Sequence, residues 1–238
     1  HFETALSDLI IHDGVVTEAV TSAGALSSDF FVIASGHSAY DTYRMLIQKG
    51  VRFRTKSFAI GCRVEHPQEL INRAQWGRKE LPGVKAAEYR LTSPGVGQLP
   101  VYTFCMCPGG TVVPATAYQH TNIVNGMSRY LRNGRFANAA CVAGVHVNTL
   151  LHREVEPLEA LDWLEMLEQT FLTAAPGYQA PFCLINDFIQ KKISTYIPET
   201  SYPLGLKPAA LWELLPKPVS EAITEGLKDF AKKIKGFQ

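Results

Sequence analysis

Apolar and polar residues in the first part of the chain predict a β-meander, then a strand, a turn and a helix. Two apolar runs flank Asp13-Gly14, a dipeptide that tolerates the positive φ angles of a tight hairpin turn. Residues 30–34 are continuously apolar, which is typical of a strand buried on both faces. Ser38 is a favourable N-cap, so a helix is expected to begin there and to end at Gly50.

The middle of the chain has the pattern of β-structure, and the last third has the pattern of helices. Residues 58–65 alternate between the two faces of a strand, with apolar side chains at every second position. Glycine and proline residues separate further expected strands at 86–91, 100–106, 111–117 and 121–125. The apolar residues 137–147 fit either a strand or a buried helix. Leucines recur at helical spacing from Pro157, and Pro218 begins a last amphipathic helix.

These elements predict an α+β fold with a mixed, mainly antiparallel β-sheet domain and a helical C-terminal portion. The β-meander and the strand-turn-helix piece are assigned to residues 1–50, and the second domain to residues 51–238. Within that second domain, residues 51–150 are rich in strands and residues 151–238 are helical.

Composition and charge narrow the function further. Lys and Arg number 23 against 22 Asp and Glu, and this near balance disfavours a nucleic-acid partner, which needs a basic surplus. The apolar runs are too short to span a membrane. The five cysteines are an odd number, which indicates reduced thiols and a cytoplasmic location rather than a disulfide framework. Their spacing matches no zinc motif, so no metal site is predicted.

The turn at Gly36-His37-Ser38 allows two chemical interpretations. A hydrolase elbow has the pattern G-x-S-x-G between a strand and a helix, but Tyr40 stands where its second glycine belongs. The alternative to a nucleophile is that Ser38 only caps the helix. Backbone N–H groups at the same turn could also face a cofactor or an anion.

Two cysteines before a Pro-Gly-Gly turn form the least ordinary segment of the chain. Cys105 and Cys107 would point to the same face of a strand. They are either redox-active or substrate-facing thiols, or small apolar residues that fill a core.

Polar residues elsewhere are candidates for substrate contact. Arg63 and Glu65 end the alternating strand, where binding sites form, although a solvated strand face explains them equally well. Arg129 follows an expected turn at residues 125–128 and begins a series of three arginines at three-residue spacing. The series could bind a phosphate or a carboxylate, or could be a solvated face.

Five segments together resemble signature stretches of the bacterial FAD-dependent dehydrogenase-like flavoproteins, and they cover essentially the whole chain. They are VIASGHSAYDTYRML, SFAIGCRVEHPQELINRAQWG, FCMCPGGTVV, NGMSRYLRNGRFANAA and LPKPVSEAITEGLKDFAKKIKGF. Such proteins combine a Rossmann-type FAD domain with a large inserted domain. The resemblance implies that residues 1–50 are a partial FAD-binding segment, with Ser35, Gly36, His37 and Ser38 near the cofactor.

The same resemblance implies that residues 51–238 are the inserted, substrate-side domain of an FAD-dependent oxidoreductase. It leaves Cys105, Cys107 and His37 as the best candidates for catalysis, with Arg63, Glu65 and Arg129 on the substrate side. The family's G-x-G-x-x-G unit and its second glycine-rich segment are missing, so the chain is expected to be an inactive fragment that binds little or no FAD.

Two other functions remain open at this stage: a non-catalytic module that binds a protein or RNA, and a serine hydrolase. The small-molecule substrate of the oxidoreductase is not identified by the sequence.

Overall fold

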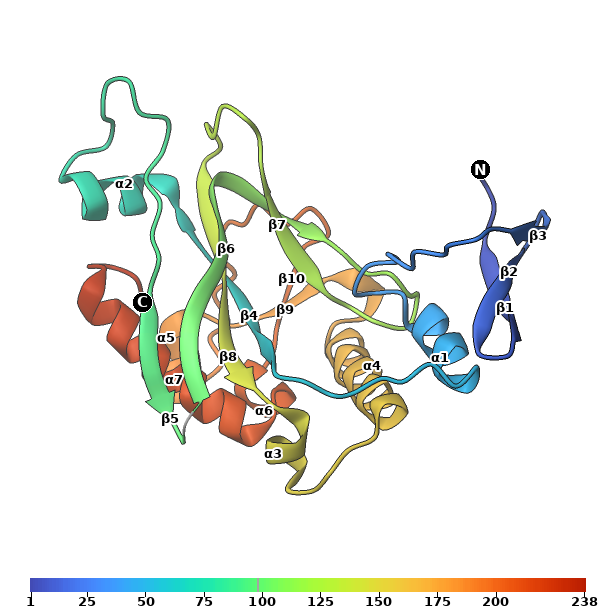
Figure 1. The fold of residues 1–238 in the computed structure, drawn as a ribbon. Helices are drawn as coiled ribbons and strands as arrows, with labels where there is room; N and C mark the ends of the chain where they lie inside the picture. The colour runs from blue at the N-terminus through green and yellow to red at the C-terminus, as the bar shows by residue number, and fades with distance from the viewer. Residues whose placement is uncertain (98) are drawn as a thin grey trace. The chain divides into compact units, whose positions relative to one another are not determined.

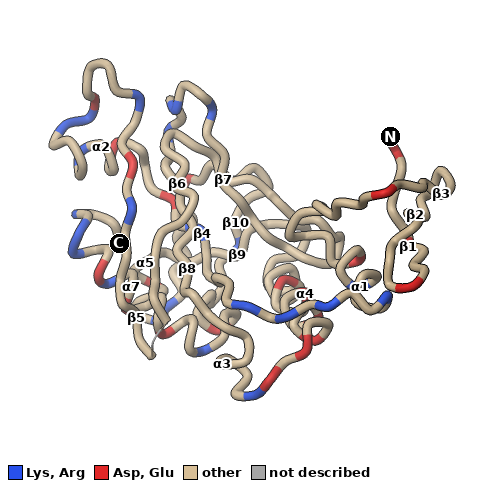
Figure 2. Tube along the Cα trace, viewed as in Figure 1, with Lys and Arg blue, Asp and Glu red and all other residues tan. Residues whose placement is uncertain are grey.

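The computed structural model describes residues 1–97 and 99–238 and has the α+β class predicted from the sequence (Figure 1). The chain divides into two compact units. The N-terminal unit comprises His1–Thr55 and Val155–Asp162, and the sheet unit comprises Lys56–Glu154 and Trp163–Gln238. Within the described residues, no helix is both long and apolar enough to cross a membrane. Figure 2 shows basic and acidic residues interspersed along the trace of both units.

The N-terminal unit contains the predicted β-meander. Its antiparallel strands are β1 (Leu6–His12), β2 (Val15–Thr21) and β3 (Gly24–Ser27), and helix α1 (Tyr40–Gln48) follows. Asp13 and Gly14 have φ angles of 50° and 78°, as the hairpin between β1 and β2 requires. Leu9 of β1 and Leu46 of α1 are buried, so the core of this unit is small.

The predicted strand at residues 30–34 is wrong, because the described residues include no strand that pairs with this segment. Phe30 and Val32 are 88% and 89% exposed. An extended apolar run becomes a buried strand only when neighbouring strands take up its backbone hydrogen bonds. The predicted cap is also wrong: α1 begins at Tyr40, its N-cap is Ala39, and Ser38 is outside the helix.

The sheet unit is built on a five-stranded antiparallel sheet. Its strands follow the order β4-β8-β6-β5, and a fifth strand, β7, pairs with the second half of β6. The strands are β4 (Phe58–Pro67), β5 (Thr92–Val96), β6 (Leu99–Pro114), β7 (Val124–Ser128) and β8 (Phe136–Val145). Strand β8 lies between β4 and β6. The apolar residues 137–147, which fitted either a strand or a helix, therefore form mainly a strand with a neighbour on each side.

Several expected strand limits differ from the structure. The strands predicted at 100–106 and 111–117 are one long strand, β6, and the turn expected at 125–128 is part of β7. The strand expected at residues 86–91 is not formed, although Ala87 and Tyr89 are buried. These differences arise from pairing with distant strands, which local residue patterns do not contain.

Helices cover one face of the sheet. Helix α7 (Lys217–Lys233) contacts four of the strands, and Phe230 and Ile223 on its apolar face are buried as the spacing predicted. Gly226 permits close approach, because a Cβ atom there would lie 2.5 Å from a methyl group of Val101. The remaining elements are α2 (Gln68–Trp76), α3 (Val147–Leu151), α4 (Pro157–Ala174), η1 (Pro176–Tyr178), β9 (Ala180–Phe182), α5 (Ile185–Gln190), β10 (Leu206–Pro208) and α6 (Leu211–Leu214).

Candidate functional site

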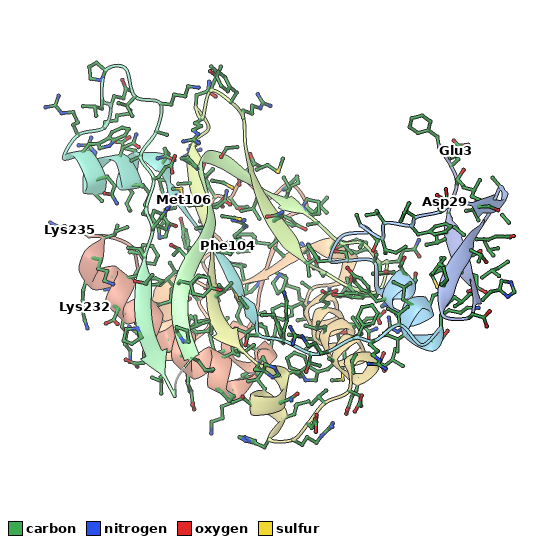
Figure 3. All side chains as sticks on the ribbon, in the orientation of Figure 1. Glu3, Asp29, Phe104, Met106, Lys232 and Lys235 are labelled. Atoms are coloured by element: carbon green, nitrogen blue, oxygen red, sulfur yellow. The ribbon has the colours of Figure 1, made fainter. Side chains whose placement is uncertain are left out.

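The face of the sheet opposite helix α7 is the more accessible one. Even-numbered residues of β4 and odd-numbered residues of β8 and of the first half of β6 point to the helix-covered core. Their sequence neighbours point the other way and stay half-buried or exposed. We call this side the open face, and it carries Arg63, Tyr102, Phe104, Ala140 and Val142. Phe104, labelled on β6 in Figure 3, is 59% exposed.

Arg63 reaches across the open face and contacts three strands. Its Nη1 donates to Oδ1 of Asn138 on β8 at 2.9 Å, and its Nη2 donates to Oδ1 of Asn125 on β7 at 3.0 Å. The carbonyl oxygen of Cys105 on β6 accepts from both nitrogens, at 3.3 and 3.5 Å. Gly126 lies against the guanidinium, since a Cβ there would be 2.7 Å from Cζ. Arg63, Asn125, Gly126 and Asn138 together form what we call the Arg63 site.

The Arg63 site brings one sequence-predicted residue together with three that the sequence analysis missed. Asn138 is completely buried within the apolar run of β8. The sequence could have pointed to this residue, because a polar amide inside an apolar run needs hydrogen-bond partners. Asn125 was assigned to a turn, which concealed its place on a strand beside Arg63. Burial lowers the pKa of Arg63 from its ordinary value.

The thiols of Cys105 and Cys107 lie beside the Arg63 site. Cys105 is exposed and has a φ of 44°, and the register of β6 against β8 shifts between Phe104 and Cys107. This bulge interrupts the alternation on which a shared face for the two cysteines was predicted. The thiol of Cys107 donates to the carbonyl oxygen of Cys105 at 3.4 Å, so the two residues still form one local cluster.

The other three cysteines belong to the core. Cys62 and Cys141 are cross-strand neighbours in the β4–β8 ladder, and all five cysteines are free. Burial raises the pKa of Cys141 and of Cys183 to about 12, and it raises the pKa of Cys62 still further. These thiols stay protonated at neutral pH and are poor nucleophiles, which leaves Cys105 and Cys107 as the accessible pair.

Glu65 is hydrogen-bonded to a distant segment of the chain. Its carboxylate accepts hydrogen bonds from the hydroxyl of Thr200 at 2.8 Å, and from the N–H group and the hydroxyl of Ser201. The hydroxyl oxygen of Ser201 also accepts from the backbone N–H of Val112 at 2.8 Å. Glu65 therefore fastens the segment around residue 200 to the sheet, and its predicted substrate contact stays a prediction.

The arginine series does not act as one patch. Arg132 forms an ion pair with Glu88, and Arg135 forms one with Glu199. Arg129 is exposed in the same loop between β7 and β8, and its predicted place on the substrate side stays a prediction.

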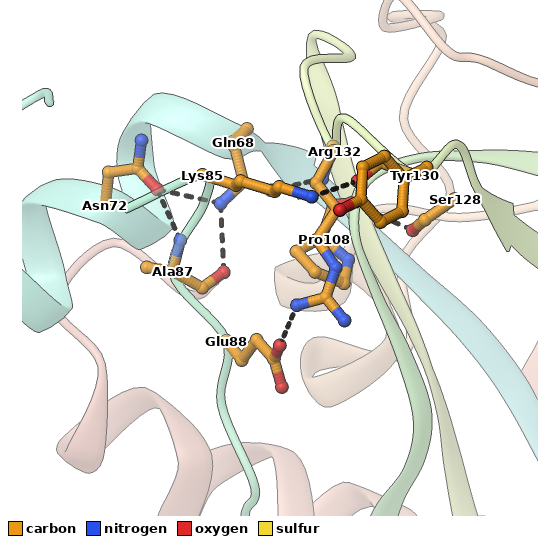
Figure 4. A network of polar contacts seen from close by, with 10 residues as sticks. Gln68, Asn72, Lys85, Ala87, Glu88, Pro108, Ser128, Tyr130 and Arg132 are labelled. Atoms are coloured by element: carbon orange, nitrogen blue, oxygen red, sulfur yellow. Dashed lines mark hydrogen bonds and ion pairs between the residues drawn. The ribbon is translucent and has the colours of Figure 1, made fainter. Parts of the chain in front are cut away.

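The Pro-Gly-Gly turn expected after Cys107 is not formed, because Pro108, Gly109 and Gly110 lie within strand β6. A buried amide network holds this segment of β6 (Figure 4). Gln68 accepts from the N–H group of Gly109 at 2.6 Å, and it donates to Asn72 at 2.8 Å and to the carbonyl oxygen of Ala87 at 3.0 Å. Gly109 has a φ of 52°, and a Cβ there would lie 2.1 Å from the carbonyl oxygen of Arg132. Glycine is therefore required at this point of β6, and helix α2 helps to fix the position of the cysteine segment.

The loop after β7 is joined to the same region. Lys85 lies over the ring of Tyr130, with Nζ 3.3 Å from the ring centroid, and donates to the carbonyl oxygen of Tyr130 at 2.9 Å (Figure 4). Ser128 donates to the carbonyl oxygen of Pro108 at 2.8 Å. These contacts limit the freedom of the loop beside the thiols.

In the N-terminal unit, the residues predicted to lie near the cofactor directly precede helix α1. They are Ser35, Gly36, His37 and Ser38. Gly36 has a φ of 81°, and its carbonyl oxygen accepts a hydrogen bond from the hydroxyl of Tyr43. The Ser38 hydroxyl and Nδ1 of His37 are 2.9 Å apart. The strand that a hydrolase elbow needs before this turn is not formed.

No metal site is found in the part of the chain that the structure describes, where no group of three or more His, Cys, Asp or Glu side chains could hold an ion.

Comparison with known proteins covers most of the chain. Residues 57–238 match the family described as FAD-dependent protein, C-terminal domain-like. An uncharacterised protein from Clostridium beijerinckii is 38% identical over 242 residues, an alignment that covers 100% of this chain and 45% of that protein. The chain therefore spans less than half the length of this relative.

Proposed function

Because the chain belongs to the family of FAD-dependent proteins that share this C-terminal domain, we propose that it is the substrate-side part of an FAD-dependent oxidoreductase. FAD, when bound, accepts a hydride or electrons from the substrate. The residues of the sheet unit bind and orient that substrate and keep water away from it. The residues that hold most of the cofactor are assigned to the remainder of a longer protein, as the length of the relative supports.

The open face carries this proposal. The exposed Cys105 and the half-buried Cys107 lie beside a half-buried cation, and Phe104 is exposed on the same face. The small residues Gly61 and Ala140 also lie on this face. Binding sites for small molecules combine apolar surface with a few well-placed polar groups, and this face offers both to a flavin or to a substrate beside it.

The residues near Gly36 fit one edge of a cofactor site. A Cβ at Gly36 would meet no atom within 4 Å, so the backbone of this turn is open to a ligand. The exposed apolar side chains of Phe30 and Val32 lead into the turn, where further strands of an FAD domain would cover them. Ser35, Gly36, His37 and Ser38 accordingly keep their proposed place near FAD.

The test compares this 238-residue chain with the longer protein that contains it. The longer protein is expected to purify with a stoichiometric flavin spectrum, and the 238-residue chain with little or none. A longer protein that binds no flavin would contradict the proposal.

A variant pair then addresses the thiols. In the longer protein, replacement of both Cys105 and Cys107 by Ser should slow turnover of the reductants and oxidants found by screening, whereas Cys183→Ala should leave it unchanged. Equal turnover in both variants would show that Cys105 and Cys107 do not take part in the reaction. The five free cysteines also favour a reducing, cytoplasmic location.

A protein-binding module is the second candidate, and one observation favours it. Met127, Tyr130 and Leu131 are exposed apolar residues in and after β7, and such groups mark contact surfaces. The net charge of +1 disfavours RNA as the partner. The hydrolase alternative has only the His37–Ser38 contact in its favour, and labelling of Ser38 by a serine-reactive fluorophosphonate would revive it.

A further inference from the structure

The guanidinium of Arg63 is a half-buried cation whose hydrogen-bond partners are all neutral. Its acceptors are the amide oxygens of Asn125 and Asn138 and the carbonyl oxygen of Cys105. Among the described residues, no carboxylate forms an ion pair with it, although the chain has 22 acidic residues. A cation removed from water without an anionic partner is unfavourable, and an anion at this position would relieve that cost.

The nearest acidic side chain along the strand is already occupied. Glu65 points to the same face of β4 as Arg63, but its carboxylate accepts from Thr200 and Ser201. The titratable groups that raise the pKa of Arg63 are the thiols of Cys107 and Cys105 and the phenol of the buried Tyr89. The phenol stays neutral, because burial raises its pKa above its ordinary value.

A neutral donor beside the guanidinium has no acceptor. Asn138 uses Oδ1 to hold Arg63, but its buried Nδ2 has no hydrogen-bond partner among the described residues. Native proteins rarely leave a buried amide N–H group unpaired, so the position requires an explanation. An anionic ligand at the Arg63 site would supply the negative charge that the neutral acceptors of the guanidinium lack.

We propose that the Arg63 site binds the carboxylate of a small organic acid with an apolar or aromatic body. The site supplies a single positive charge and neutral amides, which match one carboxylate, whereas phosphate sites recruit more cations or a helix N-terminus. The ladder places Arg63, Ala140 and Phe104 side by side on three adjacent strands. The exposed ring of Phe104 therefore provides an apolar surface close to the cation.

This inference rests on the proposed function only where it makes the acid the substrate of the oxidoreductase, because binding needs no flavin. The two are separable: if benzoate binds but the longer protein lacks flavin, the inference stands and the proposed function fails. If the longer protein holds flavin but the Arg63 site binds no acid, the reverse is true.

The experiment is a calorimetric titration of the 238-residue chain with sodium benzoate, acetate and phosphate at constant ionic strength. Benzoate is expected to bind more tightly than acetate, and phosphate no better than chloride. Arg63→Gln should weaken benzoate binding by about tenfold or more, since it removes a charged hydrogen-bond donor. Arg90→Gln, a change at an exposed arginine of the same unit, should not alter it.

Asn138→Asp is a second variant that distinguishes loss of the binding site from misfolding. It places a carboxylate beside Arg63, so it should raise the thermal stability and abolish benzoate binding by occupying the cation internally. Circular dichroism on each variant checks that the fold is retained. Wild-type protein that binds no benzoate, or an Asn138→Asp protein that is folded and binds benzoate as tightly as wild type, would overturn the inference.

Discussion

The two faces of the sheet in the sheet unit are made by the same strands but serve different purposes. On the helix-covered face, Val101 and Ala143 pair across β6 and β8 and belong with Phe230 of α7 to one core cluster, all three fully buried. The adjacent cross-strand pair, Tyr102 and Val142, points to the open face and remains partly exposed.

This difference separates the residues that stabilise the fold from those that are available to bind a ligand. The covered face contains close-packed apolar side chains, so changes there should lower the free energy of unfolding. The open face contains a cation and an amide with incomplete partners. Changes there should alter ligand binding more than stability.

The largest effect is expected from truncation at the centre of the covered face. Phe230→Ala removes a fully buried ring and leaves a cavity, so it should lower the free energy of unfolding by about 3–5 kcal/mol. Urea denaturation of the 238-residue chain measures this difference. A loss as small as that of a surface substitution would mean that α7 is not packed on the sheet as described.

A smaller effect is expected where α7 approaches the sheet. Gly226→Ala should cost about 1–3 kcal/mol, because the new Cβ would overlap with the side chain of Val101. The matched control is Gly144→Ala on the other face, where the new Cβ would meet Pro100 at an ordinary contact distance of 3.6 Å. Equal unfolding midpoints for the two variants would contradict the comparison between the faces.

Acid should weaken the covered face through His66. This residue is buried against Phe237, and its Nε2 donates to the Phe237 carbonyl oxygen at 2.7 Å. Burial lowers the pKa of His66 in the folded state, with the Phe237 contact and Glu65 opposing this shift. The unfolded chain then binds a proton first. The contribution of His66 is complete above its ordinary pKa of about 6.5 and is lost as the pH falls towards the lowered value.

The measurement is the unfolding free energy of wild type and His66→Gln across that acid range. The wild-type protein should lose stability more steeply than the variant as the pH falls from neutral. Parallel curves would show that His66 does not titrate differently in the two states.

The smallest effect on stability is expected on the open face. Phe104→Ser removes an exposed ring, so the free energy of unfolding should change by no more than about 0.5 kcal/mol. The same variant should bind benzoate more weakly, because the apolar surface beside Arg63 is lost. A large loss of stability without an effect on binding would place Phe104 in the core.

Much of the fold was predictable because its signals are local. The hairpin at Asp13-Gly14, the helix from Pro157 and the buried face of the last helix depend on turn chemistry and on hydrophobic periodicity. The apolar run at residues 30–34 misled the same reasoning. A strand needs partners, and hydrophobicity alone does not supply them.

The candidate site was predictable only in part. Arg63 and Cys105 stood out as a polar strand end and an unusual segment, but Asn125 and Asn138 are separated from Arg63 by 62 and 75 residues. Their meeting depends on the register of β4 against β8 and of β7 against β6. A shift of one residue would turn each side chain to the opposite face.

The residue pattern was therefore sufficient for the class of fold, the helical C-terminal portion and the identity of the unusual residues, because these depend on neighbours within a few positions. Only the tertiary structure decided that Arg63 has neutral partners, that Glu65 is engaged by Thr200 and Ser201, and that three of the five cysteines lie in the core or pack against it. Burial and the pairing of charges are properties of distant segments brought together, and they determine which of the polar residues remain available for chemistry.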